Sequence, residues 1–148
     1  YAGQNPSRVA GLVLVGPPGR TDPNAARQHL DALRRNFDGT MNQYWTSLLA
    51  GATADTRKRL LADVKKIPRE VGIPITAGVL AFDPAPAIRA YGGPTLIIDT
   101  SAGGSQDALF RQVPEVPRRV MIDTSHWPQL DQPQVFNRLL DEFLTRAR

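Results

Sequence analysis

The side chains able to do covalent or acid–base chemistry in this sequence are few. There is no cysteine, which excludes disulfides, thiolate metal sites and thiol nucleophiles. The two histidines, His29 and His126, lie far apart without a metal-ligand motif, so we expect neither a metal site nor a cofactor. Imidazole titrates near neutral pH and can accept and then return a proton. The available chemistry is therefore that of a histidine working with hydroxyl and carboxylate groups.

Three short aliphatic runs predict the strands that would position such groups. The runs cover Val9–Gly16, Pro94–Asp99 and Arg118–Asp123, and nearly continuous apolar runs are typical of strands covered on both faces of a parallel sheet. In open α/β sheets the carboxyl ends of the strands form the ligand crevice. Ser101 follows the second run and His126 follows the third, so both are expected at this edge of the sheet.

Helical periodicity predicts the remaining elements. Apolar residues recur at helical spacing over Asn24–Phe37, which Asp38-Gly39 is expected to close, and again over Thr40–Ala50 and Ala54–Ile67. The clearest helix covers Pro133–Leu144, with proline at its first position. Strands that alternate with helices predict parallel pairing and right-handed crossovers. The sequence thus predicts one α/β domain, with a first strand region at 1–20, a helical insert at 21–90 and the last two strands with the closing helix at 91–148.

Three stretches, in this order, resemble the α/β-hydrolase family. Tyr1–Gly19 is similar to the end of the helix after the nucleophile followed by strand six, and Pro94–Asp99 is similar to strand seven. Ser125–Pro133 (SHWPQLDQP) resembles the histidine loop, and the helix after it resembles the family's last helix. The insert corresponds to the family's helical cap. The resemblance covers nearly the whole chain and implies a partial, truncated fold: the C-terminal half, without the half that carries the nucleophile elbow.

The resemblance implies acyl transfer to water by a serine, an acid and a histidine, in that chain order. His126 matches the family's histidine and would act as general base. The family's Gly-x-Ser-x-Gly elbow does not occur in this sequence and would lie upstream of Tyr1. The acid turn is irregular. Asp107, in the loop beyond the second strand, is the better match and Asp99 the alternative, while a helix cap is an equally good role for Asp107.

Ser101 is the candidate nucleophile within the chain. Asp99–Gly104 (DTSAGG) resembles the serine elbow of another esterase group, with a buried run before it and a helix expected from Ser105. Backbone N–H groups around Ala102 would offer an oxyanion site. Aspartate stands where that elbow needs a glycine, which favours a simple Gly/Ser turn instead. Ser125, beside the histidine, is expected to point elsewhere.

Charge and hydropathy bear on the partners. The net charge is +4 and 15 of the 18 basic residues are arginine, but they alternate with carboxylates, which indicates a solvated surface and no nucleic-acid binding. No apolar stretch is long enough to cross a bilayer, so no membrane contact is expected. Tyr1–Asn5 does not resemble a signal peptide, and a cytoplasmic protein is expected. The first strand lacks the neighbour that it has in the family, which predicts a homodimer or pairing with a separate N-terminal half.

These features favour a carboxylic-ester hydrolase of α/β-hydrolase descent that acts on a small-molecule ester, with His126, Ser101 and Asp107 at its site. The alternative is a catalytically silent domain that binds a ligand or a partner through the same crevice. The insert would line an apolar pocket, in which three aromatic residues either contact an acyl chain or pack in the core: Phe37, Tyr44 and Trp45.

Overall fold

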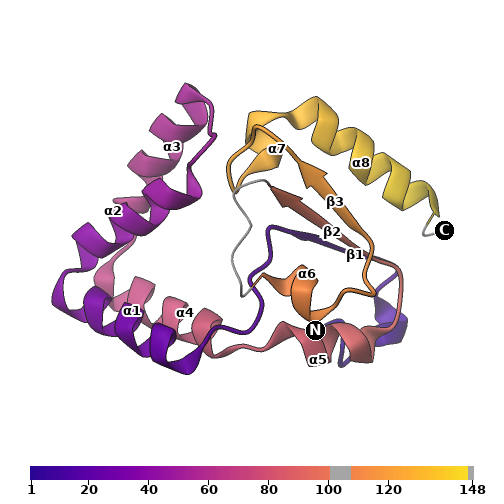
Figure 1. The fold of residues 1–148 in the computed structure, drawn as a ribbon, viewed down its shortest axis with the longest axis horizontal. Coiled ribbons are helices and arrows are strands. Elements are labelled where there is room, and N and C mark those ends of the chain that lie inside the picture. The colour runs from indigo at the N-terminus through magenta and orange to yellow at the C-terminus, as the bar shows by residue number, and fades with distance from the viewer. Residues whose placement is uncertain (101–107, 147–148) are drawn as a thin grey trace.

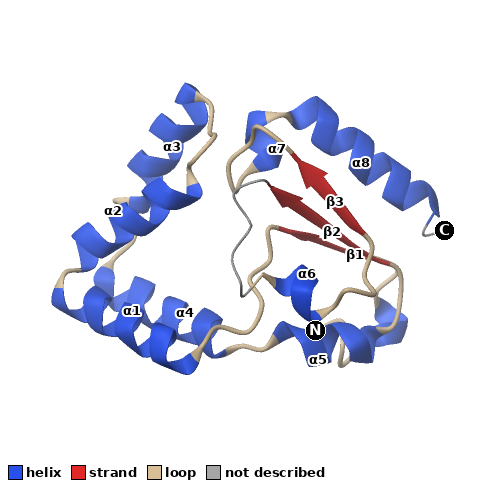
Figure 2. Cartoon of the chain, viewed as in Figure 1, coloured by secondary structure: helices blue, strands red, loops and turns tan. Residues whose placement is uncertain are grey.

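A sheet of three parallel strands lies at the centre of the computed structural model, which describes residues 1–100 and 108–146 (Figures 1 and 2). The strands are β1 (Leu12–Val15), β2 (Thr95–Thr100) and β3 (Arg118–Met121). Their order in the sheet is β1-β2-β3, and Leu12 lies opposite Thr95 in the first pair. The three aliphatic runs thus form the parallel sheet predicted from the sequence.

Alternate side chains of β2 enter two different cores. Leu96 and Ile98 pack with Met121 under α8, whereas Ile97 points to the other face and packs under α5 and α6. The helices that cover the sheet are α5 (Pro84–Tyr91), α6 (Leu109–Gln112) and α8 (Pro133–Arg146). Because helices cover both faces (Figure 1), β2 is buried at nearly every position and not only at alternate ones.

Between β1 and β2 the chain forms a group of helices with a core of its own (Figure 1). The helices are α1 (Pro23–Arg35), α2 (Phe37–Leu48), α3 (Ala54–Val64) and α4 (Arg69–Ala81). Leu33, Phe37, Met41 and Val64 are buried together in that core. Two short elements lie outside the insert and the sheet: a 3-10 turn at Pro6–Arg8 and α7 (Pro128–Asp131).

The first helix of the insert ends earlier than the sequence predicts. Asn36 lies between α1 and α2, and its N–H donates to the carbonyl oxygen of Ala32 at 2.9 Å. Its side-chain oxygen accepts the N–H of Gly39 at 3.1 Å, so one asparagine ends α1 and caps α2. The prediction that Asp38-Gly39 closes the first helix was therefore wrong, since both residues lie in the first turn of α2.

Helix α4 lacks the two-sided pattern of a typical surface helix, and the sequence alone does not reveal it. It contains Pro74, and most of its side chains are apolar. Val71, Ile75 and Val79 form an exposed stripe at helical spacing, with 45%, 61% and 53% of their surface accessible. Phe82, directly after the helix, is also exposed. We call these four residues the α4 stripe.

Helix α5 begins with a side-chain cap. Asp83 caps this helix, and its carboxylate accepts the N–H of Ala85 at 3.1 Å. Within the described ranges no single helix has both the length and the hydropathy needed to cross a membrane. Only α4 and α5 taken together reach that length, and they are bent by 62° relative to each other.

Candidate functional site

The candidate site is the carboxyl edge of the sheet, where the loop after β3 carries His126. The imidazole lies against Gly16, the residue that follows β1. A β-carbon on Gly16 would come within 2.7 Å of His126 Cε1 and 2.8 Å of Nδ1. Gly16 also has a φ of +54°, which favours glycine. Position 16 therefore favours glycine, because the imidazole of His126 occupies the space that a side chain would need. The end of β1 and the histidine loop are in contact at this point.

The insert holds the same loop from the other side. The backbone N–H of His126 donates to the carbonyl oxygen of Leu48, at the end of α2, over 3.0 Å. The next residue, Trp127, stacks on Trp45 of α2 with ring centres 5.0 Å apart and an angle of 22° between the planes. The ring of His126 is nearly perpendicular to that of Trp127, with ring centres 5.3 Å apart. The histidine is therefore fixed between the sheet and the insert.

Burial controls the charge of this histidine. His126 is half-buried, and this burial lowers the pKa of its imidazole below the ordinary value, while the negative charge of Asp99 partly opposes the effect. The lowered pKa keeps the imidazole uncharged at neutral pH. An uncharged imidazole is the form that accepts a proton.

Asp99 forms an ion pair that the sequence does not reveal. Its side chain is buried in β2, and its Oδ2 accepts hydrogen bonds from Arg118 Nη2 at 2.7 Å and Nε at 3.2 Å. Its Oδ1 accepts the N–H of Thr100 at 2.8 Å. The Arg118 guanidinium lies 3.5 Å above the ring of Phe110. The structure thus brings the charge of Asp99 near His126 but uses both carboxylate oxygens elsewhere.

The structure describes some of the other serine, aspartate and histidine residues considered in the sequence analysis, and not others. Ser101 and Asp107 lie outside the described residues, so their roles remain predictions. Ser125 is fully buried and its hydroxyl donates to Asp131 Oδ2 at 2.6 Å, which agrees with the expectation that it points away from the site chemistry. His29 is half-buried on α1, with its ring against Tyr44 at 5.4 Å.

Two of the three aromatic residues of the insert have the core-packing role, and acyl-chain contact stays a prediction. Phe37 belongs to the buried core of the insert. Trp45 packs against that core and stacks on Trp127, so it joins the insert to the histidine loop. Tyr44 is 46% exposed. Sequence reasoning missed the contacts of Gly16 and Asp131, although both residues lie in segments used for the resemblance.

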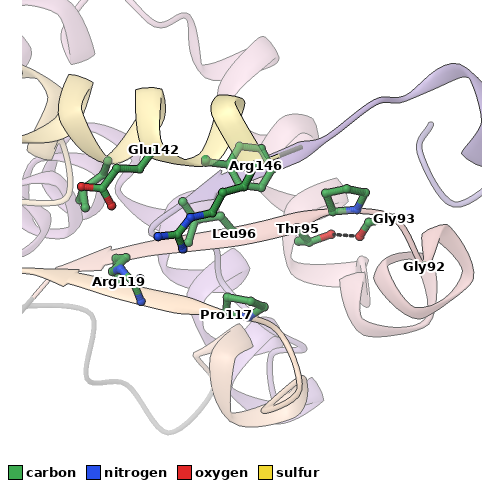
Figure 3. A pocket seen from close by; sticks show the side chains of 11 residues that line it. Gly92, Gly93, Thr95, Leu96, Pro117, Arg119, Glu142 and Arg146 are labelled. Atoms are coloured by element: carbon green, nitrogen blue, oxygen red, sulfur yellow. Dashed lines mark hydrogen bonds between the residues drawn. The ribbon is translucent and has the colours of Figure 1, made fainter. Parts of the chain in front are cut away.

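Two cavities lie beside the sheet. The larger, of about 580 Å³, lies at the amino ends of β2 and β3 under the end of α8, where Figure 3 shows Arg119, Glu142 and Arg146 around it. It is therefore at the opposite end of the strands from His126. The second, of about 500 Å³, is a groove beside β1 lined only by uncharged side chains, among them Leu12. In the described ranges no three His, Asp or Glu side chains are grouped to hold a metal ion.

No family model and no curated protein matches this sequence. Solved structures match the fold. A thermophilic esterase has a TM-score of 0.70 at 18% identity, over 97% of this chain and 59% of its own. An N-acyl homoserine lactone degrading enzyme has a TM-score of 0.69 at 22% identity, over 96% of this chain and 62% of its own. E-2-(acetamidomethylene)succinate hydrolase has a TM-score of 0.61 at 20% identity, over 97% of this chain and 60% of its own. The chain has a partial α/β-hydrolase fold and spans about three fifths of the length of these structures.

Proposed function

We propose that this chain is the histidine-bearing part of a carboxylic-ester hydrolase of α/β-hydrolase descent. The observation that carries the proposal is the environment of His126. Its imidazole lies half-buried at the carboxyl edge of a parallel sheet, and burial lowers its pKa so that it is uncharged at neutral pH. The similar folds belong to an esterase, a lactone-degrading enzyme and a hydrolase, which agrees with this chemistry.

In the proposed reaction a serine hydroxyl gives its proton to His126 while its oxygen bonds to the ester carbonyl carbon. His126 returns the proton to the leaving alcohol as the C–O bond breaks, which leaves an acyl-enzyme. A water molecule then gives its proton to His126 and attacks the acyl carbon. The carboxylic acid leaves, and the serine recovers its proton from His126.

The nucleophile and the acid are proposed from the sequence. Ser101 is the nucleophile within the chain, and a serine of a complementary N-terminal half is the alternative. Asp107 is the acid that would orient the imidazole. Asp99 is the weaker candidate for the acid, because Arg118 and Thr100 already occupy its two oxygens.

A binding domain without activity is the second candidate. It is favoured by the apolar groove beside β1, which has the volume of a small-ligand pocket. Val79 and Phe82 of the α4 stripe line part of this groove, so the apolar surface continues onto the insert. Contiguous exposed apolar surface is typical of sites that bind a ligand or another protein.

Hydrolysis of short p-nitrophenyl esters tests the proposal. We expect the parent chain to be active and His126→Ala to lose at least about 10⁴-fold in kcat. His29→Ala, which removes the other histidine, serves as the control and should retain the parent rate. If Ser101→Ala also loses hydrolytic activity, Ser101 is the nucleophile. If Ser101→Ala keeps the parent rate of hydrolysis, Ser101 is excluded. An inactive parent chain would contradict a nucleophile within the chain and favour the binding domain or a serine supplied by a partner.

A further inference from the structure

One carboxylate joins the insert to the histidine loop. Asp131 ends α7, and its two oxygens bind two different segments of the chain. Oδ1 accepts the backbone N–H of Thr53, at the start of α3, over 3.0 Å. Oδ2 accepts both the backbone N–H of Ser125 at 2.8 Å and its hydroxyl at 2.6 Å. Ser125 directly precedes His126, so Asp131 links α3 to the residue beside the imidazole.

The network stabilises the charged form of Asp131. Partial burial opposes ionisation, but the hydrogen bonds from Ser125, Thr53 and the hydroxyl of Thr56 together hold the pKa of this carboxyl below its ordinary value. The carboxylate is therefore ionised at neutral pH, and its hydrogen bonds are charge-assisted. Such bonds are shorter and stronger than those between neutral groups.

Further contacts join the same two segments around Asp131. The Leu48 carbonyl accepts the His126 N–H, and Trp45 stacks on Trp127. Gly51, with a φ of +81°, lies so close to the histidine loop that a β-carbon there would be 3.0 Å from the carbonyl oxygen of Thr124. The insert thus contacts the loop through backbone, aromatic and carboxylate groups within a short stretch.

We propose that Asp131 is a positioning residue that fastens the helical insert to the histidine loop and thereby holds His126 in place. The insert is then part of the support of the site and not a freely opening lid. The effect on catalysis rests on the proposed function, whereas the fastening itself does not.

The test uses the fact that the chain has two tryptophans, Trp45 and Trp127, and that they form the stacked pair across this junction. Two indole rings this close give an exciton couplet in the far-ultraviolet circular dichroism spectrum. Trp45→Phe should abolish the couplet, which assigns the signal to this pair. A couplet that survives Trp45→Phe would contradict the stacked junction.

Asp131→Asn keeps the volume of the side chain but leaves only one acceptor oxygen for the donors on the two sides. We expect the couplet to fall by at least about half while the helical signal remains. Asp141→Asn, which makes the same change at an exposed position on α8, should retain the couplet. Ser125→Ala deletes one donor to Asp131 and also the acceptor of the Trp127 N–H at 3.2 Å. It should lower the couplet as well, and it covers the case in which Asp131→Asn fails to fold. A parent-like couplet in folded Asp131→Asn or in Ser125→Ala would overturn the proposal.

Kinetics separate this proposal from the proposed function. If the parent hydrolyses esters, Asp131→Asn should lower kcat by about 10- to 100-fold, with KM changed by less than about twofold, because a misplaced base affects the transition state more than substrate binding. An unchanged kcat would contradict the positioning role. If the parent is inactive, the couplet still decides whether Asp131 fastens the insert.

Discussion

At the scale of the residue, the environment of His126 depends on groups that are distant in the sequence. Its place after the third strand is predictable, because an aliphatic run and a recognisable loop precede it. The role of Asp131 is not predictable, since the N–H that it binds belongs to Thr53, 78 positions away. Arg118 likewise pairs with Asp99 across two strands, 19 positions apart. Local patterns do not record such pairs, so the sequence identifies the histidine but not the groups that support it.

The lowered pKa of His126 predicts a pH dependence of stability. In the unfolded chain this histidine takes up a proton as the pH falls through its ordinary pKa of about 6.5, whereas the folded chain takes it up only at lower pH. The unfolded state therefore binds more protons in this window, and the free energy of unfolding decreases as the pH falls below about 6.5. Urea unfolding at pH 7.5, 6.5 and 5.5 measures this effect.

The matched variant is His126→Gln, which cannot take up the proton. Its free energy of unfolding should decrease less than that of the parent between pH 7.5 and 5.5. The same decrease in both proteins would contradict a lowered pKa at His126.

At the scale of the element, the strands were predictable and the helix boundaries were not. Aliphatic runs identify strands, and all three strands lie within the predicted runs to within a residue. The expectation that the third strand is covered on both faces was wrong, because β3 lies at the edge of the sheet and its Arg119 and Val120 are exposed. The boundary between α1 and α2 depends on Asn36, whose double role comes from its backbone angles. Helix α4 is not evident from the sequence because it lacks a polar face and contains Pro74, a residue that normally argues against a helix interior. Polar caps and periodicity are weaker signals than a run of aliphatic residues.

Two glycines of α4 provide a paired test of the insert. A β-carbon on Gly72 would come within 2.6 Å of the Phe37 ring, whereas one on Gly78 would meet nothing within 4 Å. Gly78→Ala should raise the free energy of unfolding by up to about 1 kcal/mol through helix propensity. Gly72→Ala should lower it by about 1–3 kcal/mol, because overpacking forces the core of the insert apart.

Urea midpoints of the two alanine variants against the parent measure both effects. Opposite signs are expected from the same substitution in the same helix. Equal shifts in the two variants would mean that the packing of Gly72 against Phe37 does not limit the stability of the insert.

At the scale of the whole molecule, β1 is the notable feature. In the described part of the chain it has a strand on one side only, and its four aliphatic side chains are all half-buried. Parallel sheets are normally covered on both faces, and an open aliphatic edge is a site for strand addition. We propose that a second copy of the chain or a complementary N-terminal half covers this edge.

Sedimentation at micromolar concentration tests the proposal for β1. Because Leu12 and Gly16 donate their N–H groups to the strand region of β2, alternation directs the N–H of Val13 to the open edge. Val13→Pro removes that donor and should reduce association at least about tenfold. Val120→Lys, on the opposite edge strand β3, should have no effect. Association lost only in Val120→Lys would assign the interface to β3, and a monodisperse parent monomer would exclude self-association.

The position of the insert between β1 and β2 also constrains how the chain folds. Leu12 pairs with Thr95, so the first two strands meet only after the ends of a long intervening segment come together. Loop closure costs entropy, and pairings distant in sequence form slowly. Helices α1 to α4 pack mainly on one another around their own core, so they can form before the sheet and shorten the effective connection between the strands. The insert would then act as a folding nucleus for a sheet to which it contributes no strand.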